Sequence, residues 1–410
     1  LFLYIESNNK GKVLGKALKK LCDNSIWKIA ERSPIFNKFF KELNNKDNLL
    51  LSLLPSQRDS ILDILTTKKS IVLNMPTSSG KSLLAELYIL FTMQNNTMGD
   101  IRPTIAYIVP TNALINQTMY KLKEDFKDFN YNIQNALPFY DIDEIEEEIL
   151  SQKHIDILVT TPEKLDLLIR QKHPSIKNLK LLVVDEAHNI SDKTRGGKLE
   201  LLLATIKQKK SEVNYLLLSP FIKNNDEIAK WLGGSDQDSF SKTLVWTPTK
   251  QYVGCNILKN NKNKSEVVYW PSARNNIVKE QVQILINENL EEVKKDIDTM
   301  DNNAYVRTIA LVDKYIHLGS VLVICKGAGV CKNMTEKLLK KIKKERKQMN
   351  IENDNEIEEL KELIKIEFDE NDILMESLDY GIAYHHAELP AIIKEEIEKL
   401  ILNNKIKVVF

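Results

Sequence analysis

The chain has 410 residues, which is too long for one ordinary hydrophobic core and predicts two or three domains. Hydrophobic residues make up 43% of the chain and charged residues 28%, a composition that excludes disordered and fibrous proteins and indicates a folded globular one. The formal net charge is only +1, so the chain lacks a global basic field, and any nucleic-acid surface must be built locally.

The cysteines and the apolar runs exclude further classes of protein. No C-x-x-C pair occurs among the cysteines, so neither a zinc site nor a disulfide framework is predicted. The cysteines are Cys22, Cys255, Cys325 and Cys331. Because no disulfide framework is predicted for these cysteines, a reducing, cytoplasmic location is expected. The apolar runs are far shorter than the roughly 20 residues of a membrane helix, and the first residues form no signal-peptide pattern, so no membrane association is expected.

In chain order, residues 1–54 mix apolar and lysine-rich stretches at roughly helical spacing, which predicts a short helical N-terminal segment. In residues 55–245, short apolar runs alternate with amphipathic segments, the pattern of an α/β domain with a parallel sheet. Residues 246–275 are expected to be a linker with one β excursion. Residues 276–410 are expected to form a second, incomplete α/β domain. Its charged segment at about 332–376 indicates a solvated helical insertion, with a partner-docking or nucleic-acid surface as the alternative.

A phosphate-binding loop is predicted at Met75–Ser82, which reads M-P-T-S-S-G-K-S. It follows the strand-like Ile71–Leu73 and precedes the helix-like Leu83–Leu90, so backbone N–H groups and a helix N-terminus would point at phosphates. Lys81 is expected to contact the β- and γ-phosphates of ATP and Ser82 to ligate Mg²⁺. Methionine stands where the G-x-x-x-x-G-K-[ST] motif begins with glycine, and a simple glycine turn before a helix is the alternative. The expected nucleotide contacts are Thr77, Ser78, Ser79, Gly80, Lys81 and Ser82.

An acidic pair, Asp185 and Glu186, directly follows the wholly apolar Leu181–Val184. The carboxyl end of a buried parallel strand is where such sheets bind ligands. Asp185 is expected to hold Mg²⁺, and Glu186 to orient or deprotonate the attacking water. A surface turn is the alternative for an isolated acidic pair, but its order and spacing after the phosphate loop favour an ATP-hydrolysing site.

These motifs resemble those of superfamily 2 helicases of the DExH-box type. Met75–Ser82 is similar to motif I and Asp185–His188 to motif II in its DEAH form, while Val109–Leu114 and Thr160–Lys164 resemble motifs Ia and Ib. The resemblance implies two RecA-like domains in tandem, ATP with Mg²⁺ as cofactors, and backbone contacts to one strand through motifs Ia and Ib. Gln57 precedes motif I by the distance of the family's adenine-reading glutamine, whose amide can pair with the base. The catalytic residues implied are Lys81, Asp185, Glu186 and His188.

Three further segments resemble the Ski-like group of these helicases: Asn189–Gly196, Ile228–Gly233 and His385–Leu389. This resemblance implies movement from 3′ to 5′ along a strand. Without this resemblance, His385 and His386 would be interpreted as core or turn residues, because paired histidines are more often these than a metal site. The nucleic-acid contacts expected from the family motifs are Pro110, Thr111, Asn112, Thr161, Pro162, Glu163, Arg195, Gly196 and His386.

The chain also departs from the family. Ser219-Pro220-Phe221 stands where motif III has Ser-Ala-Thr, which links ATP hydrolysis to strand separation, so translocation or switching is easier to expect than processive unwinding. Glu388 and Lys394 replace a glycine and an arginine.

The two ends of the sequence, Leu1 and Phe410, are expected to be cut from a longer protein, because Phe410 ends a strand-like run. Motifs V and VI of the family would begin after it. Motif VI supplies arginines that stabilise the transferring phosphoryl group, by on the order of 10³-fold or more in related NTPases. The printed stretch is therefore expected to bind ATP better than it hydrolyses it.

The predicted function is that of an ATP-dependent helicase or translocase that tracks along single-stranded or partly duplex nucleic acid, with DNA favoured. An RNA helicase is the alternative within the family, because backbone contacts do not report on the 2′-hydroxyl. A second hypothesis is an ATP-driven sensor that regulates a partner nuclease in anti-phage defence, since the Lys-, Asn- and Ile-rich composition resembles AT-rich bacteria, where Hachiman systems pair such a helicase with a nuclease. A scaffold that keeps only the fold is disfavoured, because Lys81, Ser82, Asp185 and Glu186 are all present.

Overall fold

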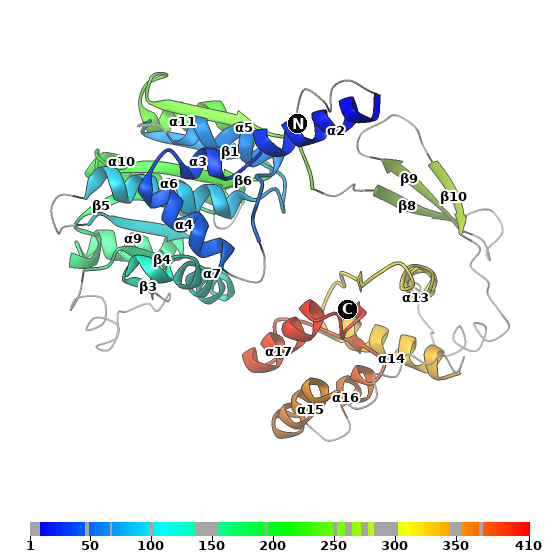
Figure 1. The fold of residues 1–410 in the computed structure, drawn as a ribbon. Helices are drawn as coiled ribbons and strands as arrows, with labels where there is room; N and C mark the ends of the chain where they lie inside the picture. Colours follow the sequence, from blue (N-terminus) through cyan, green and yellow to red (C-terminus); the bar gives the residue numbers. More distant parts are fainter. Residues whose placement is uncertain are drawn as a thin grey trace. The chain divides into compact units, whose positions relative to one another are not determined.

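The computed structural model describes residues 9–45, 49–65, 68–97, 102–136, 154–192, 196–248, 252–258, 265–271, 278–282, 302–344, 354–368 and 372–410. The chain divides into two compact units, residues 1–250 and 251–410 (Figure 1). In the described part of the chain, no helix is long and apolar enough to cross a membrane.

The first unit is built on a sheet of seven parallel strands in the order β3-β4-β2-β5-β6-β1-β7. The strands are β1 (Ser70–Asn74), β2 (Thr104–Ile108), β3 (Ile133–Ala136), β4 (Ile157–Thr160), β5 (Leu179–Val184), β6 (Asn214–Ser219) and β7 (Ser239–Thr243). The central strands are almost entirely buried apolar runs, as expected for a parallel sheet covered on both faces. The predicted α/β class and the first RecA-like sheet are confirmed.

Helices cover both faces of this sheet (Figure 1). Because successive strand residues point to opposite faces, Leu181 and Val183 of β5 enter one core, and Leu182 and Val184 enter the other. The first core also contains residues of α3 (Trp27–Ala30), α4 (Pro34–Asn44), α5 (Pro55–Ile64), α6 (Lys81–Asn96) and α7 (Asn112–Asp125). The second contains residues of α9 (Pro162–Arg170), α10 (Gly196–Lys209) and α11 (Asn225–Gly233).

The predicted N-terminal helical segment is confirmed as α2 (Asn9–Asp23), α3 and α4. α4 starts where a helix is expected to start, because Pro34 follows Ser33, whose hydroxyl accepts a hydrogen bond from the N–H of Ile35. Phe39 of α4 is fully buried, and its ring lies 5.7 Å from that of Phe126, just after α7. α4 is therefore packed into the first core.

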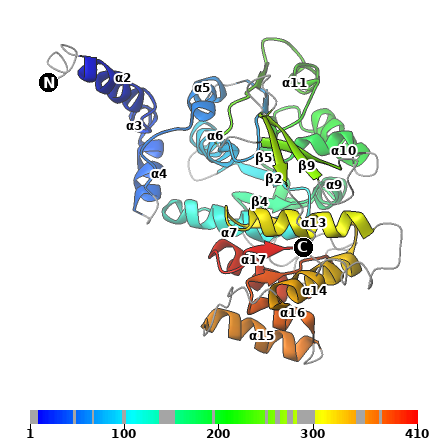
Figure 2. The same cartoon turned by 90° about the vertical axis from the view of Figure 1, so that its right-hand side faces the viewer.

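The sheet brings the predicted motifs to one edge. All seven strands run parallel, so the residues that follow β1, β2, β4, β5 and β6 meet at the carboxyl edge. Backbone hydrogen bonds hold these strand ends together: the N–H of Met75 donates to Ser219 O over 2.7 Å, and the N–H of Asp185 donates to Ile108 O over 2.9 Å. This edge carries the phosphate loop, the DEAH box and motifs Ia, Ib and III. Figure 2 labels the helices that follow three of these loops, α6, α7 and α9.

The second unit contains two small sheets. β8 (Tyr252–Leu258), β9 (Ser265–Pro271) and β10 (Val278–Val282) form an antiparallel sheet, so much of the stretch expected to be a linker folds as strands. β11 (Val321–Leu322), β13 (Val408–Val409) and β12 (Ile382–Ala383) form a parallel sheet in that order. The described helices of this unit are α13 (Asn302–Tyr315), α14 (Ala328–Lys344), α15 (Asn355–Glu367), α16 (Ile373–Leu378) and α17 (Ala391–Leu402).

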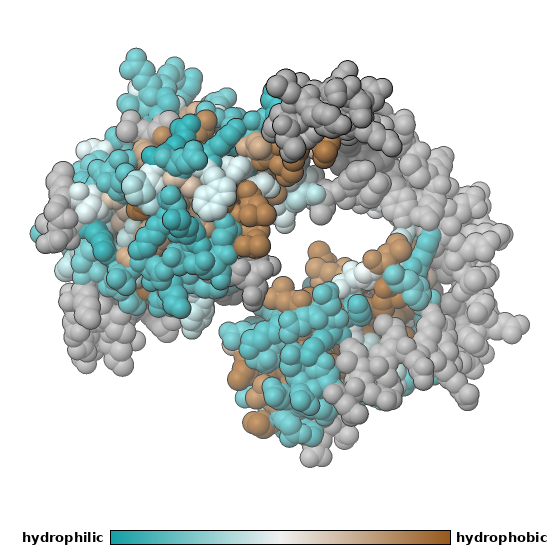
Figure 3. Space-filling view, in the orientation of Figure 1, coloured by the Kyte–Doolittle hydropathy of each residue, from teal (hydrophilic) through white to brown (hydrophobic). Residues whose placement is uncertain are grey.

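The described parts of the segment expected to be a solvated insertion are largely helical, but they also contribute to the core of the second unit. Leu338 and Ile342 of α14 and Leu360 and Ile364 of α15 are all buried in that core. The helices are amphipathic: their charged residues lie outside, and one apolar stripe packs inward. The visible surface of both units is accordingly mainly hydrophilic (Figure 3).

Candidate functional site

The loop after β1 has a backbone that only certain residues adopt. Ser78 and Gly80 both have positive φ, 59° and 84°. The positive φ of Gly80 favours glycine, and a Cβ atom there would lie 2.0 Å from Nε2 of Gln57, so any other residue would also displace the Gln57 amide. α6 begins at Lys81, directly after Gly80, and the unpaired N–H groups of its first turn lie at the loop.

Two side chains at the start of α5 hold this loop. The Ser56 hydroxyl donates to Ser79 O over 2.8 Å, and Nε2 of Gln57 donates to Gly80 O over 3.1 Å. Oε1 of Gln57 accepts from the N–H of Leu54 over 2.9 Å, so both ends of its amide are engaged by backbone groups in this structure. Sequence reasoning assigned Gln57 to adenine and missed Ser56, whose only signal is its place beside Gln57.

The ammonium group of Lys81 lies in the site with few acceptor atoms around it. Its side chain is only 10% exposed, and Nζ has no hydrogen-bond acceptor among the described residues. The nearest carboxylate oxygen, Oε1 of Glu186, lies 3.5 Å away. A buried donor without an acceptor costs free energy, so a phosphate oxygen between the loop and α6 would satisfy Lys81. The residues present therefore fit a nucleotide phosphate.

The acidic pair lies at the end of β5. Burial raises the pKa of the Asp185 carboxyl, although the backbone N–H of Glu186 donates to its Oδ1 over 2.9 Å. A divalent cation would stabilise the ionised carboxylate, and with the exposed hydroxyl of Ser82 it offers the oxygen ligands that Mg²⁺ prefers. Glu186 has a φ of 50°, which turns the chain directly after the strand.

The histidine of the DEAH box has an aromatic neighbour that sequence reasoning missed. Nδ1 of His188 lies 3.2 Å from Oε2 of Glu186. The ring of Phe221 meets that of His188 edge to face, with centroids 6.2 Å apart and an interplanar angle of 87°. Phe221 is 75% exposed although it follows a buried strand. The departure from motif III therefore places a ring beside the catalytic candidates.

Six of the predicted nucleic-acid contacts lie at the same carboxyl edge, after β2 and β4. Thr111 and Asn112 are exposed at the start of α7. Thr161 precedes α9 and is only 3% exposed, and its hydroxyl has no hydrogen-bond partner in the described part of the chain. Pro162 and Glu163 are half-buried in the first turn of α9. Pro110, before α7, is half-buried as well.

The other three predicted contacts are placed differently. Arg195 lies outside the described residues. Gly196 is buried, and a Cβ atom there would lie 2.2 Å from Ile190 O, so its role in the structure is close packing at the start of α10. His386 lies in the second unit, where its ring stacks on Tyr384 with centroids 5.5 Å apart.

Comparison with known proteins gives the same family. Residues 54–227 match the family described as DEAD/DEAH box helicase. The chain is 30% identical over 369 residues to the ATP-dependent DNA helicase Hel308 of Methanocaldococcus jannaschii, covering 89% of this chain and 27% of that protein. It is 23% identical over 404 residues to the Hachiman protein HamB of Bacillus cereus, covering 94% of this chain and 34% of that protein.

A second archaeal relative, Hel308 of Methanococcus vannielii, is 27% identical over 361 residues, covering 87% of this chain and 43% of that protein. The chain thus spans between about a quarter and less than half of the length of these relatives. The phosphate loop, the DEAH box and their geometry lie within the matched residues 54–227. The chain therefore contains a DEAD/DEAH box helicase domain, which spans residues 54–227, and is homologous to Hel308 and HamB.

Proposed function

We propose that the protein is an ATP-dependent helicase or translocase that moves along a single strand of nucleic acid, with DNA as the favoured strand and 3′ to 5′ as the direction. The observation that carries this proposal is the Lys81 ammonium, which lies buried beside Glu186 without a hydrogen-bond acceptor among the described residues. DNA is favoured because the two Hel308 relatives are named ATP-dependent DNA helicases.

Each residue of the site has a distinct role in this proposal. Lys81 and the first turn of α6 bind the β- and γ-phosphates of ATP, which supplies the phosphoryl group that is transferred to water. Ser82 and Asp185 hold Mg²⁺. Glu186 orients the attacking water and accepts its proton, and His188 keeps the Glu186 carboxylate in place from 3.2 Å.

The strand contacts are proposed on the same edge of the sheet. Thr111 and Asn112 are exposed at the N-terminus of α7, and Thr161 lies at that of α9, so backbone N–H groups and hydroxyls together face a phosphate backbone. Such contacts ignore base identity, which suits movement along any sequence. Binding of single-stranded DNA is expected to weaken with salt at a log–log slope of about −0.7 per phosphate contacted.

The test is ATP hydrolysis by the full-length protein with no nucleic acid, with single-stranded DNA and with RNA of the same sequence. Lys81→Ala is the blank, because it removes the phosphate ligand. We expect stimulation by DNA above that by RNA, absent in the variant. Stimulation by RNA alone would make the protein an RNA helicase, and no turnover under any condition would refute an ATP-driven motor.

A second function is favoured by one comparison: the chain resembles the Hachiman protein HamB over 94% of its length. On this basis the motor would act as a nucleic-acid sensor that controls a nuclease in anti-phage defence. Phe221 in place of the threonine of motif III supports switching over unwinding. Isolation of the full-length protein from its native host should then recover a nuclease, and a motor that unwinds duplexes by itself without such a partner would contradict this role.

A further inference from the structure

Two charged side chains that the ATP site does not use join α6 to α7. Glu86 lies on α6, and its side chain is only 4% exposed. Lys121 lies on α7 and extends its ammonium to Oε1 of Glu86, 2.5 Å away, although its own side chain is half exposed. Nζ of Lys121 also lies 3.8 Å from Oδ2 of Asp125, one turn further along α7.

This contact spans the strand that leads to motif Ia. α6 packs on β5, and α7 packs on β4 and β3, while β2 lies between β4 and β5 in the sheet. Tyr107 of β2 is buried in the core shared by both helices. The Glu86–Lys121 contact therefore crosses over β2 on the face of the sheet that α6 and α7 cover, beneath the carboxyl edge that holds the phosphate loop and motif Ia.

The same two helices begin at the two sites that a motor must connect. α6 begins at Lys81, which is five residues or about 7.5 Å before Glu86, and α7 begins at Asn112, which is nine residues or about 13.5 Å before Lys121. A helix of this length moves as one body, so a displacement at its first turn reaches the contact.

A gain in the free energy of unfolding does not by itself explain the Glu86–Lys121 contact. A buried carboxylate that needs a lysine from the surface is commonly no more stabilising than apolar residues of the same volume. Apolar residues of both helices, such as Ile89 of α6 and Ile115 of α7, form the core at this place, and Asp125 of α7 also acts on the Glu86 carboxyl. Within this largely apolar core, Glu86 is paired with a lysine of the other helix.

We infer that Glu86 and Lys121 are positioning residues that couple the nucleotide state of the phosphate loop to the strand-binding residues at the start of α7. The inference rests on the proposed function, because it needs motif Ia to contact the strand. A phosphate bound at the first turn of α6 draws on that helix, and the contact with Lys121 carries the shift to Thr111 and Asn112. Neither residue is among the proposed nucleotide or strand contacts.

The experiment compares four variants of the protein: Lys121→Met, Glu86→Gln, the double variant Glu86→Gln/Lys121→Met, and Lys123→Met. Lys123 is an exposed lysine on the same helix, so its variant removes the same charge from α7 and controls for electrostatic attraction of nucleic acid. Two quantities are measured: the stimulation of ATP turnover by single-stranded DNA, and the change in DNA affinity when a non-hydrolysable ATP analogue is added.

We expect Lys121→Met to reduce both quantities about fivefold, because coupling between two sites is reciprocal. Glu86→Gln should also reduce both quantities. The double variant Glu86→Gln/Lys121→Met should lose no more than Lys121→Met alone, since both substitutions remove the same contact. The KM for ATP and the turnover without DNA should stay within about twofold of the wild type. Lys123→Met should resemble the wild type throughout.

Three results would overturn the inference, and only one of them would also overturn the proposed function. If the wild type shows coupling and Lys121→Met keeps it, the contact is merely structural and the proposed motor stands. If the wild type shows no coupling between ATP and DNA, the proposed function fails and the inference fails with it. Equal losses in Lys121→Met and Lys123→Met would attribute the effect to net charge and also refute the inference.

Discussion

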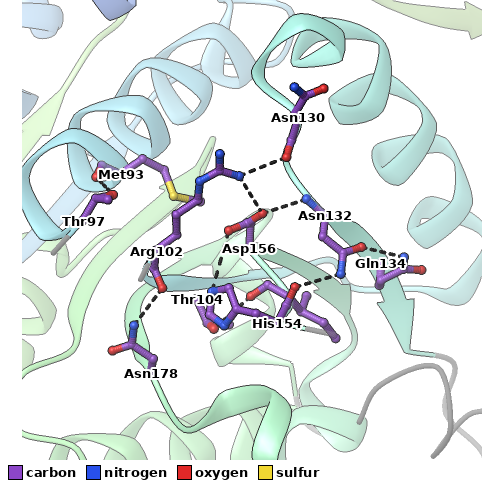
Figure 4. Close-up of polar contacts among 11 residues, drawn as sticks. Met93, Thr97, Arg102, Thr104, Asn130, Asn132, Gln134, His154, Asp156 and Asn178 are labelled. Carbon is purple, nitrogen blue, oxygen red and sulfur yellow. Dashed lines mark hydrogen bonds and ion pairs between the residues drawn. The ribbon is translucent and has the colours of Figure 1, made fainter. Parts of the chain in front are cut away.

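The two edges of the seven-stranded sheet differ in how their polar groups are used. At the amino edge, Nη1 of Arg102 donates to Asn130 O over 2.9 Å and lies 3.3 Å from Oδ2 of Asp156 (Figure 4). The same carboxylate oxygen accepts from the N–H of Asn132 over 2.8 Å, and Asn178 donates to Arg102 O. These residues immediately precede or flank the starts of β2, β3, β4 and β5, and they fasten the strands to one another.

At the carboxyl edge, by contrast, important polar groups lack a hydrogen-bond partner among the described residues. The Lys81 ammonium and the Thr161 hydroxyl have no hydrogen-bond partner among the described residues, Ser78 and Glu186 have positive φ, and the Phe221 ring is exposed. A polar group left without a partner inside a protein costs free energy, and such groups gather where a ligand supplies the missing partner. Oδ1 of Asp156 at the amino edge also lacks a hydrogen-bond partner, so the difference lies in the cations: Arg102 is hydrogen-bonded to backbone and carboxylate oxygens, whereas the Lys81 ammonium has no hydrogen-bond acceptor among the described residues. This difference suits the amino edge to stability and the carboxyl edge to binding.

The largest effect that separates the two edges is expected from Glu186→Gln. The amide keeps the size of the side chain but cannot accept a proton from water, so ATP turnover should fall by roughly 10²–10⁴-fold, as on loss of a general base. ATP binding and the thermal midpoint of unfolding should change little. Steady-state turnover and calorimetric titration with ATP would measure this. Loss of ATP binding in the variant would mean that Glu186 shapes the phosphate site instead.

A second effect concerns Glu86, beneath the carboxyl edge. Burial raises the pKa of its carboxyl to about 7, from an ordinary value of 4.5, although Lys121 opposes this shift. Below pH 4.5 both the folded and the unfolded chain hold the proton. Between pH 4.5 and 7 the unfolded chain releases it first, so stability falls as the pH rises, by a total on the order of 3 kcal/mol.

Glu86→Gln should remove this pH dependence, because glutamine does not ionise. Urea unfolding of the wild type and the variant at several pH values between 4.5 and 8 would measure it. Other groups titrate in the same range, so the difference between the two proteins is the informative quantity. If the two stability curves run parallel across this window, the Glu86 carboxyl ionises at its ordinary pKa.

A third, smaller effect is expected at the amino edge. Asp156→Ala leaves the N–H of Asn132 without its acceptor and Arg102 without its carboxylate, which should cost about 1–3 kcal/mol of unfolding free energy. ATP turnover per folded molecule should not change. Asp156→Asn is the control, since its amide oxygen can still accept from Asn132, and it should lose less. A turnover defect measured well below the unfolding midpoint would contradict a purely structural amino edge.

The smallest effect is expected from Phe221→Ala. The edge-to-face contact with His188 is mostly exposed, and aromatic pairs contribute about 0.5–1.5 kcal/mol when well packed, so turnover should change by about threefold. The KM for ATP should stay as it is. Val245→Ala removes another exposed apolar side chain of the same unit and serves as the control. Equal effects of the two variants on turnover would show that the ring has no particular action on His188.

The sequence by itself determined the parallel-sheet class and the order of the functional loops. Buried parallel strands read as short apolar runs, and the residues directly after each run must meet at one edge of the sheet, so Lys81, Asp185 and Thr161 could be placed from local patterns alone. The helices in the described parts of residues 332–376 could also be predicted, because charged residues and apolar stripes alternate at helical spacing. The burial of these helices in a core could not be predicted from the sequence, since burial depends on which elements pack against them.

Only the tertiary structure decided which distant side chains meet. The Gln57 amide turns to the phosphate loop 23 residues further along, Lys121 reaches Glu86 across 35 residues, and Phe221 lies against His188. No local pattern predicts these contacts, because the strands that bring them together are neighbours in the sheet and not in the chain. Contacts of this kind depend on the packing of helices across the sheet, which a linear sequence does not display.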